Sequence, residues 1–195
     1  ATPALSSAPS SVSPEAVTMS TGSIVDNGNL IRKVALPMEV FPLATVLFNL
    51  AQFVLALIVF FPMALFFFRV PVALSWTMFL PILALQILFT LGLCLIVSTA
   101  TVFYRDIRHF TEILLMLLFW LTPVIYDIKI IPASLRSVID MNPLAYFILA
   151  YQDALYHNTV SPPDKLLILA LLAFLSLFLG YAFFAYSKVR FPEEV

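Results

Sequence analysis

One short stretch, Tyr104-Arg-Asp-Ile-Arg-His-Phe, has the residue types to form a charged site between two apolar segments. Its ionisable groups are Arg105, Asp106, Arg108 and His109. On a helix, Arg105 would share a face with Arg108 and His109, whereas Arg105 and Asp106 point in different directions. Charges are too costly to sit in hydrocarbon, so the cluster belongs at a water interface. It is either a turn between two membrane helices or a cytoplasmic gate that also contacts a partner protein.

Three carboxylates, Asp127, Asp140 and Asp153, are candidates for acid–base chemistry on a lipid-linked sugar. Such an enzyme needs paired acids or a metal held in fixed geometry. The three acids are spread along one segment, and His109 and His157 lie far apart, so no metal-ligand set is indicated. No G-x-x-x-x-G-K-[ST] stretch exists for a bound nucleotide. The sequence therefore favours a chain that is not an enzyme and that binds no metal and no cofactor.

The composition points to a membrane protein. The chain is 62% hydrophobic and only 11% charged, whereas soluble domains average about 25% charged residues. The net charge is −1 and no basic stripe exists, so nucleic acid is not an expected partner. Cys94 is the only cysteine and cannot form an internal disulfide.

Gaps between charges mark the membrane helices, because a span needs about 20 apolar residues. Continuous apolar composition favours helices over a barrel. We predict an all-α membrane protein with four transmembrane helices, at about 43–67, 78–103, 110–126 and 166–187. Residues 130–158 are apolar but too short to cross, and are predicted to form a re-entrant or interfacial helix pair. The alternative is a surface loop that carries an amphipathic helix.

Basic residues near the span ends predict the orientation. Six of them, on one side, outnumber four on the other, which places both termini and the charged stretch in the cytoplasm. The six are Arg32, Lys33, Arg105, Arg108, Lys188 and Arg190, and the four are Arg69, Lys129, Arg136 and Lys165. Residues 1–22 are rich in Ser, Pro, Ala and Thr and are predicted to be a disordered or non-native tail.

Three ordered motifs resemble one family. They are NLIRKVALPMEVFPLA (29–44), FYRDIRHFTEILLMLLFWLTPVIY (103–126) and NPLAYFILAYQDALY (142–156). They are similar to the ABC-2-type permeases that export O-antigen, capsule or teichoic-acid polysaccharides across the bacterial inner membrane. This resemblance implies a homodimer, a lipid-linked polysaccharide as substrate, and a separate cytoplasmic P-loop ATPase that carries ATP and Mg. A permease for drugs or other lipids is the alternative within this family.

The same resemblance implies six membrane helices, of which the four predicted here correspond to the last four. The first two are therefore expected to be absent from this sequence. Residues 43–195 would form the transmembrane domain. Two positions depart from the family, since Leu36 and Met38 replace a usual aromatic and a usual basic residue on either side of the proline.

Residues 23–42 are expected, by resemblance, to contain a cytoplasmic coupling helix that sits in a cleft of the ATPase. Its residues would be Asn29, Leu30, Ile31, Arg32, Lys33, Pro37 and Glu39. From the residues alone, Asn29 can cap a short helix and Pro37 can end it. The alternative is a positively charged membrane anchor with no partner.

Aromatic residues crowd the third span and the segment after it. Tyr126, Tyr146 and Trp120 are candidates to line a pore, where their rings would stack on sugars. An interfacial aromatic belt is the favoured interpretation for each of them taken singly. Asn49, Gln52 and Gln86 lie in the first two spans, where hydrogen bonding between helices is their expected role.

Overall fold

The computed structural model describes residues 14–28, 37–68, 74–122, 142–155, 159 and 162–191. Within these residues every regular element is a helix, which confirms the predicted all-α class. The long helices are α3 (Val40–Phe68), α4 (Phe79–Phe103) and α8 (Pro163–Ser187), and the shorter ones are α5 (Ile107–Leu121) and α7 (Pro143–Leu155). Two 3-10 turns, η1 (Val25–Asn27) and η2 (Leu74–Met78), precede α3 and α4.

Three of the described helices are long and apolar enough to cross a membrane. These candidate spans are Val40–Ile58, Trp76–Phe103 and Pro163–Ser187. Helix α5 covers 15 residues and ends at Leu121, because the backbone of Thr122 is extended, so the predicted span 110–126 is wrong as one continuous helix. Residues 123–126 lie outside the described residues. A count of three spans is therefore supported, and a fourth remains a prediction.

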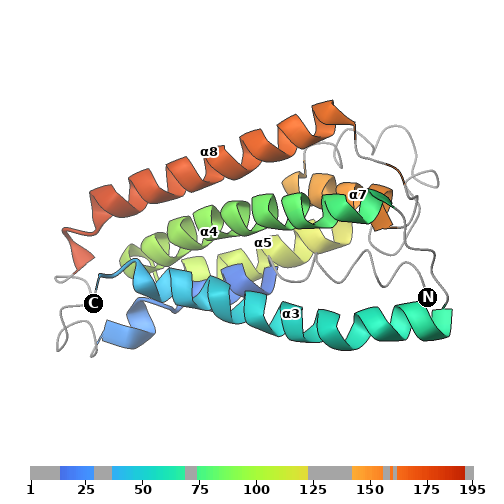
Figure 1. Cartoon of the computed structure of the whole chain (residues 1–195). Helices are drawn as coiled ribbons and strands as arrows, with labels where there is room; N and C mark the ends of the chain where they lie inside the picture. Colours follow the sequence, from blue (N-terminus) through green and yellow to red (C-terminus); the bar gives the residue numbers. More distant parts are fainter. Residues whose placement is uncertain are drawn as a thin grey trace.

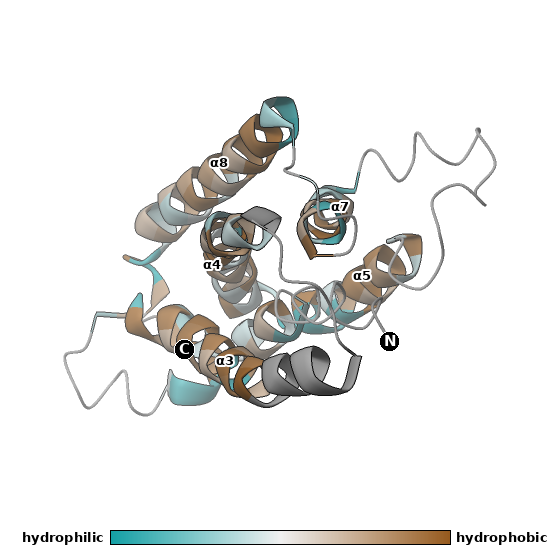
Figure 2. Ribbon diagram, turned by 45° about the vertical axis from the view of Figure 1, so that its right-hand side comes forward, coloured by the Kyte–Doolittle hydropathy of each residue, from teal (hydrophilic) through white to brown (hydrophobic). Residues whose placement is uncertain are grey.

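Helix α4 lies at the centre of the bundle, with α3, α5, α7 and α8 around it (Figures 1 and 2). The outward faces of α3, α5 and α8 carry large apolar side chains such as Leu55, Met116 and Phe178, each more than half exposed. The residue colours of Figure 2 are correspondingly brown along the helices and teal near their ends. Such a surface suits a bilayer, where lipid rather than water is the solvent.

The closest packing in the bundle joins α4 to α8 at two glycines. A Cβ placed on Gly92 would overlap backbone atoms of Ser176 and Leu177, and one on Gly180 would overlap the carbonyl oxygen of Gly92. The buried Ser176 hydroxyl also donates a 3.0 Å hydrogen bond to the backbone oxygen of Phe89. Small residues allow helix backbones to approach in membranes, where water provides no driving force for association. This backbone contact holds α8 against α4.

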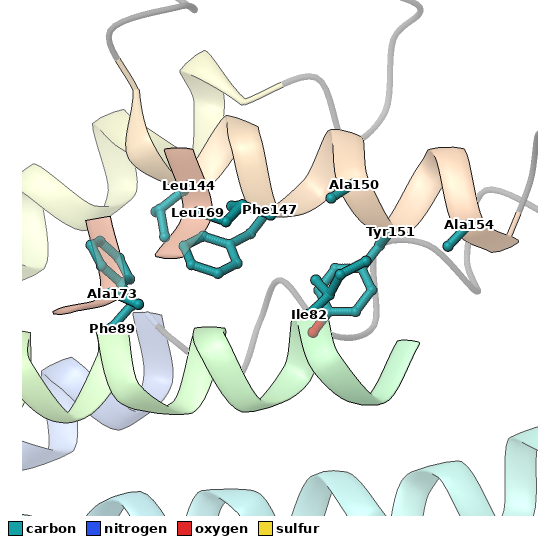
Figure 3. Packing of buried hydrophobic residues seen from close by; sticks show 9 residues of the cluster. All are labelled: Ile82, Phe89, Leu144, Phe147, Ala150, Tyr151, Ala154, Leu169 and Ala173. Atoms are coloured by element: carbon teal, nitrogen blue, oxygen red, sulfur yellow. The ribbon is translucent and has the colours of Figure 1, made fainter. Parts of the chain in front are cut away.

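Helix α7 is buried against α4 and α8 (Figure 3). Its residues Phe147, Ala150, Tyr151 and Ala154 are at most 2% exposed and pack in one cluster with Ile82 and Phe89 of α4 and Leu169 and Ala173 of α8. The alternative of an amphipathic helix on a surface loop is therefore wrong for Pro143–Leu155. Residues 130–141, the first half of the predicted re-entrant pair, lie outside the described residues.

The predicted tail is structured in its second half. Residues 14–21 form a helix, and Ala16 and Val17 are buried beside Cys94 and Leu115. The Ser20 hydroxyl donates a 3.1 Å hydrogen bond to the backbone oxygen of Cys94 in α4. The prediction of a disordered tail is wrong for residues 14–22, because tertiary packing supplies the burial that this polar sequence lacks on its own. Residues 1–13 lie outside the described residues.

Candidate functional site

One end of the bundle collects the charged residues of η1, the start of α3, the α4–α5 turn and the end of α8; we call it the charged end (at the left in Figure 1). Helix α4 ends at Tyr104, whose backbone is extended, and Arg105 and Asp106 form an exposed turn before α5 begins. The charged stretch is thus a turn between two helices. A role as a cytoplasmic gate remains a prediction.

Arg108 is the centre of the ion pairs at the charged end. Its guanidinium nitrogens lie 3.9 Å from the Asp26 carboxylate and 3.9 Å from the Glu112 carboxylate. The pair with Glu112 joins residues four positions apart, across one turn of α5. His109 Nδ1 lies 3.8 Å from the same Glu112 carboxylate. All four side chains are about half exposed or more, so each pair contributes at most about 1 kcal/mol.

A glycine makes room for the contact between Asp26 and Arg108. A Cβ on Gly22 would overlap the Asp26 carboxylate and lie 3.6 Å from an Arg108 nitrogen. Gly22 lies at the end of the buried helix of residues 14–21, so the carboxylate is folded back over that helix end. The absence of a side chain at Gly22 therefore allows Asp26 to contact Arg108 of α5.

A second ion pair lies on the other side of the predicted coupling residues. Glu39 precedes α3, and its carboxylate accepts a 3.3 Å hydrogen bond from Lys188 at the end of α8. Asp26 thus contacts α5 and Glu39 contacts the end of α8. Of the predicted coupling residues, Pro37 and Glu39 are described, and Pro37 is exposed. Asn29, Leu30, Ile31, Arg32 and Lys33 lie outside the described residues.

The motif Asn142-Pro143 joins α5 to α7. The Asn142 side-chain oxygen accepts a 3.0 Å bond from the Leu144 backbone nitrogen and so caps α7, with Pro143 at the first helical position. The Asn142 amide nitrogen donates to the Leu118 carbonyl at 3.2 Å and to the Thr122 hydroxyl at 2.9 Å. Asn142 is 2% exposed. One buried amide thus starts α7 and binds the last turn of α5.

A second polar contact joins α7 to α4. The Tyr151 hydroxyl donates a 2.7 Å hydrogen bond to the Gln86 side-chain oxygen, and both residues are buried. The contact confirms that Gln86 bonds between helices, as the sequence indicated. Asn49 instead donates to the Thr45 carbonyl within α3 and to the Met19 sulfur of the preceding helix.

A groove with a volume of about 500 Å³ lies between the helix of residues 14–21, α3 and α5. Its polar lining comes from Glu15, Thr18, Asn49, Gln52 and Glu112. Its apolar lining consists of Pro14, Met19, Leu115, Met116 and Phe119. Glu112 therefore belongs both to this groove and to the ion pairs of the charged end.

Two of the three candidate pore-lining aromatics, Trp120 and Tyr146, are described. Trp120 is 62% exposed on α5, where its ring lies edge-to-face with that of Phe119. Tyr146 is half-buried beside the α4–α7–α8 cluster. Tyr126 lies outside the described residues. Neither described aromatic lines the 500 Å³ groove, whereas Phe119 does.

Asp153 has a structural partner at the opposite end of the bundle. Its carboxylate accepts a 2.8 Å hydrogen bond from Lys165, which ties α7 to the start of α8. Among the described residues no group of three His, Cys, Asp or Glu side chains could hold a metal ion. Asp127 and Asp140, the other two carboxylates of the enzyme alternative, lie outside the described residues.

Two features of this site had weak signals in the sequence. Asn142-Pro143 is a common helix start, but nothing local shows that the Asn142 amide also reaches α5. Glu15 lay in the predicted tail, and only its place at the groove gives it a possible function.

Known proteins resemble this chain along most of its length. A family model described as ABC-2 type transporter matches residues 12–156. The chain is 34% identical over 177 residues to an O-antigen export system permease protein RfbA of Klebsiella pneumoniae, covering 90% of this chain and 68% of that protein. It is 29% identical over 177 residues to the protein of the same name in Myxococcus xanthus, covering 89% of this chain and 67% of that protein.

Proposed function

Since the chain belongs to the ABC-2 type transporter family, we propose that it is the membrane permease subunit of an ATP-driven exporter. Its substrate would be a lipid-linked polysaccharide moved across the bacterial inner membrane. The observation that carries this proposal is the family match over residues 12–156 together with relatives named as O-antigen export permeases. The three long apolar helices of the described residues support a membrane-spanning role.

In this proposal, ATP and Mg bind to a separate cytoplasmic ATPase, and two copies of the permease form the passage. The charged end, which includes the C-terminal end of α8, faces the cytoplasm. The residues between Asp26 and Glu39 contact the ATPase, and the ion pairs Asp26–Arg108 and Glu39–Lys188 support this role, because they connect the segment to α5 and α8. Closure of the ATPase would then move both helices. The cytoplasmic gate beside this contact would consist of Arg105, Asp106, Arg108 and His109.

Reversing the charge of Arg32 and Lys33 together, with glutamate at both positions, is expected to lower recovery of a P-loop ATPase about tenfold or more. In this proposal Arg32 and Lys33 face acidic groups of the ATPase, so glutamate at both positions would bring like charges together, which costs several kcal/mol at an interface. The measurement is a mild-detergent pull-down of the tagged chromosomal product from its host, with mass spectrometry of its partners. Asp164→Lys, an exposed charge reversal at the opposite end of α8, is the matched control and should retain the partner. Failure of the unaltered protein to recover any ATPase would refute the exporter.

Replacing Asp127, Asp140 and Asp153 together with asparagine is expected to leave export within about twofold of the wild type. Asparagine at 153 still accepts a hydrogen bond from Lys165, and a partly exposed ion pair contributes only about 1 kcal/mol. Cell-surface polysaccharide is the readout. A membrane enzyme that uses these acids would instead lose about a hundredfold or more, the usual contribution of general acid–base catalysis.

A further inference from the structure

We propose that the groove between the helix of residues 14–21, α3 and α5 binds the hydroxyl-rich glycan part of the transported molecule. This inference rests on the proposed function, and names where within the permease the substrate lies. The groove has a volume of about 500 Å³, which suits a few sugar units.

The groove reaches the middle of a candidate membrane span. Gln52 lies twelve residues after Val40 at the start of α3, which at 1.5 Å per residue is about 18 Å along the helix. The hydrocarbon core of a bilayer is about 30 Å thick. Gln52 is exposed and lines the groove, in the middle of a candidate span. A primary amide at this depth is unfavourable against acyl chains, so this side of α3 faces water, protein or a polar ligand.

The other walls of the groove, formed by the helix of residues 14–21 and by α5, carry carboxylates. Glu15 is exposed and lines the groove, and its neighbour Pro14 also lines a small cavity with Gln86 and Phe147, deep between α4 and α7. Glu15 is therefore well below the charged end. Glu112, 44% exposed, lines the groove closer to that end. Ionisable groups inside membrane domains face aqueous cavities or partners rather than lipid. The groove is thus a mostly apolar path that extends inward from the charged end and carries carboxylate and amide side chains along its walls.

The side chains that line the groove favour a sugar as the ligand. The carboxylates of Glu15 and Glu112 and the amide of Gln52, all exposed, offer hydrogen-bond acceptors and donors for sugar hydroxyls. Phe119 and the adjacent apolar side chains of α5 offer a surface for the C–H faces of sugar rings. No lysine or arginine is among the residues that line the groove in the described part of the chain, and its two carboxylates repel anions. The lining therefore suits neutral sugar units and not the phosphates of a lipid carrier.

The test is cysteine accessibility in host membranes, with the full chromosomal product and its partners present. Cys94, the only cysteine of this sequence, is buried, so labelling above that of the unaltered protein reports the surroundings of the introduced thiol. Gln52→Cys is expected to react with a charged, membrane-impermeant maleimide at least about tenfold faster than Leu55→Cys, because the reactive thiolate needs water. Leu55 is the matched control, 63% exposed on the same helix and outside the groove. Thr18→Cys, on the opposite wall, should behave like Gln52→Cys.

Host lipid extract that contains lipid-linked glycan should then protect Gln52→Cys and Thr18→Cys from labelling. Extract from a strain that lacks the glycan should not. Equal, slow labelling of Gln52→Cys and Leu55→Cys would overturn the proposal, as would protection by both extracts. If any of these results appears while the ATPase is still recovered, the groove is wrong and the exporter stands.

Discussion

Replacing Gly180 with leucine is expected to destroy most of the packing between α4 and α8. Any side chain at this position overlaps the Gly92 carbonyl, and backbone atoms, unlike side-chain ends, cannot rotate away. Overpacking a well-filled core usually costs about 1–3 kcal/mol, and a backbone overlap belongs at or above the top of this range. The folded-to-unfolded equilibrium constant should fall about a hundredfold or more. Thermal unfolding and size-exclusion profiles in detergent are the measurements.

The control for this change is Ala182→Leu. Ala182 is an exposed residue of α8 only two positions from Gly180, so the same side chain there enters lipid. Its unfolding midpoint should match the wild type. Gly180→Ala and Gly92→Leu complete the series, and the alanine variant should lie between the wild type and Gly180→Leu. Similar midpoints for Gly180→Leu and Ala182→Leu would show that α4 and α8 do not meet at these glycines.

Replacing Asn142 with alanine is expected to destabilise the protein by about 2–4 kcal/mol. The loss of a helix cap costs about 1 kcal/mol. Each of the two further hydrogen bonds from the buried amide, to Leu118 and Thr122, contributes about 1 kcal/mol, and more if a partner stays unsatisfied. Because α7 would lose its attachment to α5, export should fall together with the unfolding midpoint.

Asn142→Ser separates the two roles of this residue. Serine is a good helix cap, but its side chain is too short to reproduce the contacts with α5. The free energy of unfolding of Asn142→Ser should be about 1 kcal/mol higher than that of Asn142→Ala and still lower than that of the wild type. If Asn142→Ser is as stable as the wild type, the contact with α5 contributes nothing. Thr122→Val, which removes the shared hydroxyl, should show a smaller effect when combined with Asn142→Ala than when made alone.

The positions of the long helices could be predicted because hydrocarbon excludes charge. Charge-free stretches led to spans at about 43–67, 78–103 and 166–187, and the structure has helices at Val40–Phe68, Phe79–Phe103 and Pro163–Ser187. The contact between Gly92 and Gly180 could not be predicted in the same way. Each glycine is unremarkable within its own helix, and only the packing of the two helices makes them a pair.

The ion pairs show the same division between local and distant contacts. Arg108–Glu112 follows from spacing on one helix. Glu39–Lys188 joins residues 149 positions apart, and no periodicity connects them. The prediction of disorder for residues 14–22 was wrong for a related reason. Their composition is that of a disordered segment, but Ala16 and Val17 are buried against α4 and α5. This burial depends on residues far away in the sequence, so the composition of the segment alone could not predict it.

The α4–α8 contact has a consequence for the order of biosynthesis. The residues joined by the Ser176–Phe89 hydrogen bond are 87 positions apart, so the ribosome adds that many residues before α4 can receive its partner. At roughly 5–20 residues per second, this takes on the order of 5–15 seconds. During that time the glycine face of α4 is inside the membrane without α8. An insertase or chaperone that shields small, polar helix faces would find its target there, in the nascent chain.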